Sequence, residues 1–205
     1  MGVKVKICGI TNLADAQASV EAGADMLGFI FCEASPRNMT VAKVAYIAQK
    51  LPAAVVKVGV FVNPPEEHVI QAIAGCGLNM VQFHGDETPQ FCAQFGVMSM
   101  KAFRVWDNES LKALPHYHTD AWLLDAFAED KAGGTGKTFN WELATEAQRF
   151  GKQIFLAGGL TPENVAEAVR KVRPFAVDVS SGVESSPGMK DQVKVRAFIS
   201  AARSA

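Results

Sequence analysis

Short apolar runs rich in β-branched and aromatic residues recur eight times along the chain, and a helical pattern follows each of them. Most of these runs are continuously apolar, as is typical of strands covered on both faces. The expected strands span 3–8, 26–32, 55–62, 80–84, 100–105, 121–125, 153–158 and 175–180. The expected helices span 12–24, 40–51, 64–77, 88–96, 108–114, 141–151, 161–172 and 191–204.

This rhythm predicts the fold class. Successive strand ends lie 20 to 33 residues apart, with no break in composition between them. Parallel strands joined by helices make right-handed crossovers, and eight such units close into a (β/α)₈ barrel. A doubly wound open sheet is the alternative, but eight units in 205 residues fit a small barrel better. We expect an α/β protein with one (β/α)₈ TIM-barrel domain over residues 1–205.

Charge, apolar runs and cysteine content indicate which partners and which cellular compartment to expect. The chain has 20 Lys and Arg against 21 Asp and Glu, which gives no indication of a nucleic-acid or membrane partner. No apolar run reaches the roughly 18 residues of a membrane span. The N-terminus lacks the apolar segment of a signal peptide, and the four cysteines form no C-x-x-C pair. We expect a cytoplasmic protein with reduced thiols.

The glycine-rich segment 128–141 contains Gly136-Lys137-Thr138, the ending of a nucleotide-binding loop. That motif requires a glycine five positions before Gly136, where the chain has Lys131. The segment follows the sixth expected strand and is the longest glycine-rich connection. We expect a mobile lid that excludes water, with a disordered connection as the alternative. Its glycines are Gly133, Gly134 and Gly136.

Two loops at the end of the chain suggest phosphate binding. Gly158 and Gly159 follow the seventh strand, and Ser180-Ser181-Gly182 follow the eighth. In barrel enzymes these two loops frequently form the phosphate site, because glycines let backbone N–H groups approach an anion. Either loop alone could be a simple turn, but two in adjacent positions favour a phosphorylated small-molecule substrate.

Cys8 ends the first strand and Asp125 ends the sixth, so both belong at the catalytic end of a barrel. Taken singly, a buried cysteine is usually a packing residue, and a strand-end aspartate is often a helix cap. Together, a thiol and a carboxyl at one barrel mouth form a possible base and acid. The thiol needs a nearby positive charge to become a competent base, and the carboxyl needs desolvation to keep its proton.

Motifs for metals and organic cofactors do not occur in the sequence. The four histidines lack the H-E-x-x-H spacing, and neither G-x-S-x-G nor a strand-following G-x-G-x-x-G is present. We therefore expect no metal and no cofactor.

Several segments together resemble the phosphoribosylanthranilate isomerase family of tryptophan biosynthesis. They are KICGIT, FxxxSPRN, VGVFVN, VQFHGDE, LLDA, GGTGKTFNW, LAGGLTPENV and VDVSSGVESSPGMKD. They run in the family's order from residue 4 to about 200. The chain stops after the eighth expected helix, so it is similar to the stand-alone enzyme.

The resemblance implies an Amadori rearrangement, an aldose–ketose isomerisation of N-(5-phosphoribosyl)anthranilate. Asp125 would protonate the furanose oxygen, and Cys8 would remove the C2 proton. Arg37 would hold the anthranilate carboxylate, a role that suits a guanidinium. Asp178 would contact the sugar hydroxyls, and His84 would lie near the aromatic ring. The residues expected to take the phosphate are Gly158, Gly159, Ser180, Ser181 and Gly182.

Two other functions are compatible with such a barrel. One is the related isomerase of histidine biosynthesis, whose strand-1 base is a carboxylate where this chain has Cys8. The other is a non-catalytic barrel that binds a sugar phosphate, which would need neither Cys8 nor Asp125. We expect a monomer rather than a homodimer. Cys32 ends the strand beside Cys8, and we expect that oxidation could couple the two thiols.

Overall fold

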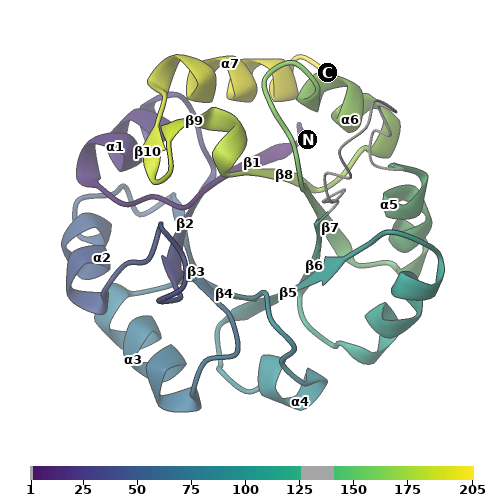
Figure 1. Cartoon of the computed structure of the whole chain (residues 1–205), viewed down its shortest axis with the longest axis horizontal. Helices are drawn as coiled ribbons and strands as arrows, with labels where there is room; N and C mark the ends of the chain where they lie inside the picture. Colours follow the sequence, from purple (N-terminus) through teal and green to yellow (C-terminus); the bar gives the residue numbers. More distant parts are fainter. Residues whose placement is uncertain (1, 126–140) are drawn as a thin grey trace.

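The computed structural model describes residues 2–125 and 141–205, which form a closed barrel of eight parallel strands. Figure 1 looks down the barrel, with the strands as an inner ring and the helices outside. The strands are β1 (Lys4–Cys8), β2 (Met26–Phe31), β3 (Val56–Phe61), β4 (Met80–Phe83), β5 (Met98–Arg104), β6 (Ala121–Asp125), β7 (Gln153–Ala157) and β8 (Ala176–Val179). Every strand ends within one residue of its predicted end, so the predicted (β/α)₈ class is confirmed.

The connections between strands are mostly helical. The α-helices are α1 (Leu13–Glu21), α2 (Val41–Ala48), α3 (Glu66–Cys76), α4 (Pro89–Cys92), α5 (Trp141–Ala147), α6 (Val165–Val172) and α7 (Gln192–Arg203). The 3₁₀ helices are η1 (Glu109–His116), η2 (Gln148–Phe150) and η3 (Ser181–Val183). Side chains of Asn12, Thr40, Thr88 and Asp191 cap α1, α2, α4 and α7 by accepting backbone N–H groups.

Two predicted helices are shorter or tighter than expected. The segment 88–96 forms only the single turn α4, and 108–114 forms the 3₁₀ helix η1 instead of an α-helix. Pro115 lies inside η1 and has no N–H to donate, which disfavours a regular α-helix there. Helix α6 begins at Val165, after a turn in which the Asn164 side chain accepts the Thr161 N–H.

A short antiparallel hairpin follows β8 where a plain loop was expected. It consists of β9 (Glu184–Ser186) and β10 (Met189–Lys190). The hairpin docks on α1, because the Thr11 hydroxyl donates to the Gly188 carbonyl and the Lys190 N–H donates to Asp15. Gly188 has a φ of 83°, a conformation that favours glycine. The hairpin therefore places Glu184 and Lys190 beside the barrel mouth.

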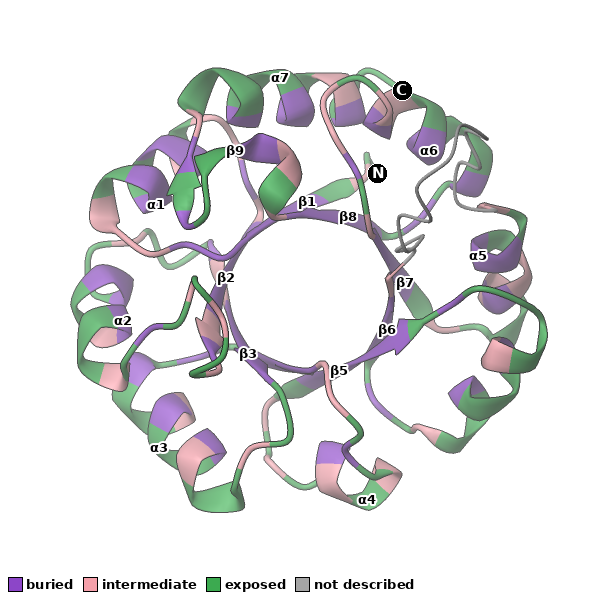
Figure 2. Cartoon of the chain, in the orientation of Figure 1, coloured by how far each residue is buried: buried purple, intermediate pink, exposed green. Residues whose placement is uncertain are grey.

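The alternation of side chains along each strand divides the apolar core in two. Figure 2 shows the strands buried almost throughout. One cluster fills the barrel interior and includes Met26, Val58, Met100, Leu123 and Phe155. A larger cluster packs between the outer faces of the strands and the helices. Residues of one parity along a strand therefore share the barrel interior.

Closure of the barrel brings the first and last strands into register. Lys6 of β1 lies opposite Met26 of β2 on one side and opposite Asp178 of β8 on the other. Through this pairing, residues 172 positions apart in sequence become neighbours inside the barrel.

The predicted lid and the expected absence of a membrane span are the two remaining points. The lid glycines Gly133, Gly134 and Gly136 lie outside the described residues. Within the described ranges, none of the helices combines the length and the apolar character that crossing a bilayer requires.

Two tryptophans provide a matched test of the core. Trp122 is 1% exposed and packs against Phe103 and Phe150, whereas Trp106 is 71% exposed. We predict that Trp122→Ala lowers the free energy of unfolding by about 3–5 kcal/mol, because it leaves a cavity. Trp106→Ala should change it by less than about 0.5 kcal/mol. Urea denaturation followed by circular dichroism measures both, and similar losses would contradict the assignment of the core.

Candidate active site

A cavity of about 230 Å³ lies at the C-terminal mouth of the barrel. Its wall contains both predicted catalytic residues, Cys8 and Asp125, together with His84 and Asp178. Five predicted phosphate-binding residues also line it: Gly158, Gly159, Ser180, Ser181 and Gly182. The structure therefore brings the thiol, the carboxyl and both predicted phosphate loops to one space, at the end of the barrel where such enzymes have their active sites.

A buried lysine lies beneath the Cys8 thiol. Lys6 is 0% exposed, and its ammonium donates to Asp178 Oδ1 at 2.9 Å. Gly28, the register partner of Cys8 on β2, leaves space for both groups. A Cβ at Gly28 would lie 2.7 Å from the Cys8 sulfur and 3.2 Å from Lys6 Nζ. The sulfur and the ammonium thus share one small volume inside the barrel.

Opposing effects act on the protonation of Cys8. Burial raises the pKa of the thiol and Asp178 raises it further, while Lys6 and Lys190 lower it; the net pKa is above the ordinary thiol value. Burial lowers the pKa of Lys6, but Asp178 and Cys8 outweigh this effect, so that its net pKa is raised. Lys6 is therefore a permanent cation that favours the thiolate form of Cys8.

Arg37 lies next to Cys8 in a network with the β9–β10 hairpin. Its Nε and Nη2 donate to the two carboxylate oxygens of Glu184, at 2.8 and 2.5 Å. Lys190 also donates to Glu184, at 2.8 Å. Burial raises the pKa of Glu184, but the hydrogen bonds from Arg37 and Lys190 outweigh it and hold the net pKa below the ordinary value. A Cβ at Gly9 would lie 2.6 Å from Arg37 Cδ, so the guanidinium stem crosses the chain directly after Cys8.

Asp125 faces a different set of partners. Its Oδ2 lies 3.2 Å from His84 Nε2, and His84 Nδ1 lies 3.0 Å from Gln82 Nε2. Gln82 is 1% exposed and lines the same cavity. The structure thus places His84 against the predicted acid, and a contact between His84 and a substrate ring stays a prediction.

The two predicted phosphate loops meet each other. Gly158 and Gly159 have φ values of 85° and 62°, and a Cβ at Gly159 would have nothing within 4 Å. A Cβ at Gly182 would overlap the carbonyl oxygen of Leu160, so the loops after β7 and β8 pack closely. The Ser180 hydroxyl is buried and has no hydrogen-bond partner among the described residues. An anion in the cavity could accept a hydrogen bond from this hydroxyl.

The expected coupling of Cys8 and Cys32 is not supported by the register. Cys8 lies opposite Gly28, and Cys32 follows the end of β2, four residues further along. At about 3.3 Å per residue, the two Cα atoms are separated by roughly 10 Å or more. A disulfide requires about 7 Å or less, so oxidative coupling would need a movement of the backbone.

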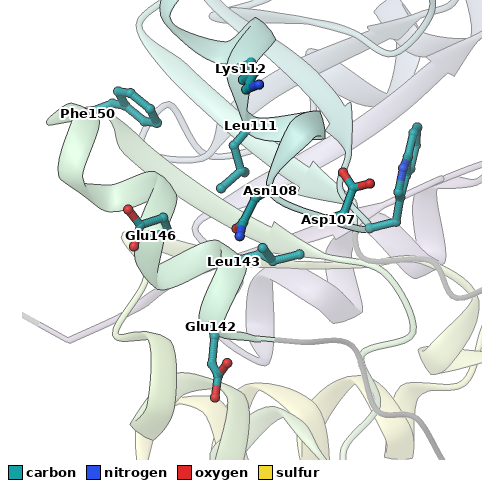
Figure 3. Close-up of a pocket in the computed structure, with 9 residues that line it drawn as sticks. Asp107, Asn108, Leu111, Lys112, Glu142, Leu143, Glu146 and Phe150 are labelled. Carbon is teal, nitrogen blue, oxygen red and sulfur yellow. The ribbon is translucent and has the colours of Figure 1, made fainter.

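A larger hollow of about 750 Å³ lies between η1 and α5. Figure 3 shows Asn108, Leu111 and Lys112 on one side of it and Leu143 and Glu146 on the other. None of the predicted site residues lines this hollow. Chemistry is therefore assigned to the smaller cavity at the barrel mouth.

The sequence interpretation missed four polar residues of the site. Lys6 and Gln82 precede Cys8 and His84 by two positions, and side chains two apart lie on the same face of a strand. A polar residue at an inward position of an apolar strand was the signal that could have revealed both. Glu184 and Lys190 gave no such signal, because their place depends on the hairpin.

Comparison with known proteins agrees with this geometry. A family model described as N-(5'phosphoribosyl)anthranilate (PRA) isomerase matches residues 5–201. The chain belongs to this family. It is 53% identical to the N-(5'-phosphoribosyl)anthranilate isomerase of Pelobacter propionicus, over 98% of this chain and 96% of the relative. It shares 42% identity and a TM-score of 0.92 with the crystal structure of the isomerase from Thermotoga maritima, covering 99% of this chain and 100% of that one.

A second solved relative contains a ligand. It is a phosphoribosyl anthranilate isomerase in complex with reduced 1-(o-carboxyphenylamino)-1-deoxyribulose 5-phosphate. It is 40% identical to this chain, with a TM-score of 0.89, covering 99% of this chain and 100% of that one. Family membership confirms the predicted resemblance and the isomerase class, and it decides against the histidine-pathway enzyme and the non-catalytic barrel.

The charges around Cys8 can be tested without any turnover. We predict that Lys6→Met raises the pKa of Cys8, because it removes a cation, and that Asp178→Asn lowers it, because it removes an anion. The pH midpoint of Cys8 alkylation by iodoacetamide, followed by mass spectrometry of the labelled peptide, should move in opposite directions. Labelling of Cys32 in the same samples is the internal control. Shifts of the same sign in both variants would contradict the electrostatic assignment.

Proposed function

We propose that this chain catalyses the isomerisation of N-(5'-phosphoribosyl)anthranilate in tryptophan biosynthesis, with Cys8 as general base and Asp125 as general acid. The assignment of roles rests on one observation. The thiol and the carboxyl line one cavity together with the loops after β7 and β8. A phosphorylated substrate held by those loops would have its sugar between the two titrating groups.

Ring opening needs a proton given to the ring oxygen, and enolamine formation needs a proton removed from C2. Asp125 protonates the furanose ring oxygen, and the bond from that oxygen to C1 breaks to give a Schiff base. Cys8 then removes the proton from C2, which produces an enolamine. The enolamine then gains a proton at C1 and loses the proton of its C2 hydroxyl, which leaves the ketone at C2. Hydrogen is only relocated within the substrate, so the chemistry requires no redox cofactor.

The environment of Cys8 supports its role as the base. Lys6 and Lys190 lower the pKa of the thiol and partly offset the effect of burial. The thiol is still mostly protonated at neutral pH, because its net pKa is raised. The fraction of enzyme with a competent base therefore increases as the pH rises toward that pKa.

Arg37 and Glu184 together support recognition of the substrate's carboxylate. Glu184 accepts from the Nε and Nη2 atoms of Arg37, which fixes the plane of the guanidinium and leaves the Nη1 side for a ligand. A carboxylate on that side would receive a charge-assisted hydrogen bond. Glu184 thus acts as a positioning residue for Arg37, while Asp178 remains our proposed contact to the sugar hydroxyls.

The phosphate assignment rests on the loops after β7 and β8. The Ser180 hydroxyl supplies a buried donor, and Gly158 and Gly159 expose backbone to the cavity without side chains. Ser181 and Gly182 continue the same wall in η3. Backbone amides and hydroxyls of this kind suit a dianionic phosphate.

Oligomeric state and location remain our predictions. We propose a monomer in the cytoplasm, although one solved relative from Thermotoga maritima is described as dimeric.

The proposed reaction is tested by the loss of substrate fluorescence after purified protein is added to phosphoribosylanthranilate. We predict turnover by the wild type, and a fall in kcat of about 10²-fold or more in both Cys8→Ala and Asp125→Asn, because each removes a proton-transfer group. Cys32→Ala, a cysteine outside the cavity wall, should retain the wild-type rate. Absence of wild-type turnover would reject the function, and near-normal rates in both variants would reject the assigned roles.

Glu184 provides a separate test of carboxylate recognition. Glu184→Gln removes the charge that holds Arg37, and charged hydrogen bonds contribute about 1.5–3 kcal/mol, so we expect KM to rise by roughly tenfold or more. The kcat should change much less, because Glu184 does not touch the reacting atoms. Glu33→Gln, an exposed residue of the loop that carries Arg37, is the matched control. An unchanged KM in Glu184→Gln would show that Arg37 needs no such partner.

A further inference from the structure

Three side chains form a hydrogen-bonded row across the mouth of the barrel. Gln82 belongs to β4, His84 follows that strand, and Asp125 ends β6. Gln82 Nε2 is 3.0 Å from His84 Nδ1, and His84 Nε2 is 3.2 Å from Asp125 Oδ2. The intervening strand β5 contributes Ala102, which lines a neighbouring hollow together with His84.

The row has one consistent assignment of protons when the Gln82 nitrogen faces His84. An amide nitrogen only donates, so Nδ1 of the imidazole must accept and carries no proton. The neutral ring then has its proton on Nε2, and this N–H donates to Asp125 Oδ2. Both ring nitrogens are thereby engaged, and Gln82 selects the tautomer without touching Asp125.

We propose that Gln82 is a positioning residue for the acid: through His84 it determines which oxygen of Asp125 delivers the proton. With Oδ2 accepting from His84, the transferable proton resides on Oδ1, the oxygen left for the substrate. A neutral imidazole places no full positive charge beside Asp125. An imidazolium would instead favour the ionised form of Asp125, which has no proton to give to the substrate. This inference rests on the proposed role of Asp125 as acid.

The other end of the Gln82 amide can be held by a bound substrate. Gln82 Oε1 is buried and has no hydrogen-bond partner among the residues that the structure describes, and Gln82 lines the cavity. Buried acceptors are seldom left unpaired. An N–H or O–H of a bound substrate would satisfy Oε1 and would hold the amide in the orientation that donates to His84.

The decisive measurement is the tautomer of His84, which long-range ¹H–¹⁵N NMR of histidine-labelled protein reports directly. In the wild type we expect a neutral ring with Nε2 protonated and Nδ1 bare. Methionine has a similar length to glutamine but no amide, so in Gln82→Met we expect both neutral tautomers of His84 to be populated. A protonated Nδ1 in the folded wild type, or an unchanged spectrum in Gln82→Met, would overturn the proposal. This readout does not depend on turnover, so it separates failure of this inference from failure of the proposed function.

Kinetics test whether the effect passes through Asp125. We expect kcat of Gln82→Met to fall by about tenfold, a part of the 10²–10⁴-fold that a general acid contributes. In an Asp125→Asn background the same substitution should have little further effect, because the residue on which it acts is gone. Gln90→Met, at an exposed position of α4, should leave both kcat and the spectrum unchanged. Equal losses in both backgrounds would mean that Gln82 acts independently of the acid.

Discussion

Closure of the barrel between β1 and β8 is the constraint on which the whole site depends. The pairing sets Lys6 opposite Asp178 and leaves every second residue of each strand facing the interior. Because all eight strands run parallel, their carboxyl ends meet at one mouth. A shift of one residue in the register of β1 would turn Lys6 and Cys8 outward together. The geometry of the candidate site is therefore determined first by strand register and only then by the loops.

The ion pair between Lys6 and Asp178 is better explained by chemistry than by stability. Removing an ion from water costs several kcal/mol, and a buried pair often contributes no more to stability than apolar residues of similar volume. Both groups of this pair are buried in an interior that is otherwise largely apolar. The pair places a cation next to the Cys8 sulfur, and an apolar replacement would remove the largest of the charges that favour its ionised form.

Strand periodicity and loop composition were sufficient to predict the barrel and most of its cavity wall. Cys8, Asp125, Gly158 and Ser180 each sit at the end of a strand, and a parallel barrel brings all strand ends together. Interactions that depend on three-dimensional contacts could not be predicted in this way. The bidentate contact of Arg37 with Glu184 joins residues 147 positions apart and requires the β9–β10 hairpin, which has no strong strand pattern. Likewise, the row from Gln82 to Asp125 crosses a whole strand of the barrel.

The charges around the cavity differ between the side of the proposed base and the side of the proposed acid. Lys6, Lys190 and Arg37 surround the β1 side, and each interacts electrostatically with Cys8. On the β6 side, Asp125 contacts an imidazole that is itself held by a neutral amide. The cations on the β1 side favour loss of a proton from Cys8, whereas the proposed acid on the β6 side contacts an imidazole instead. Two carboxylates offset the charge of these cations. Glu184 pairs with Arg37 and Lys190, and Asp178 pairs with Lys6. The net positive charge beside Cys8 is therefore small until an anionic substrate enters.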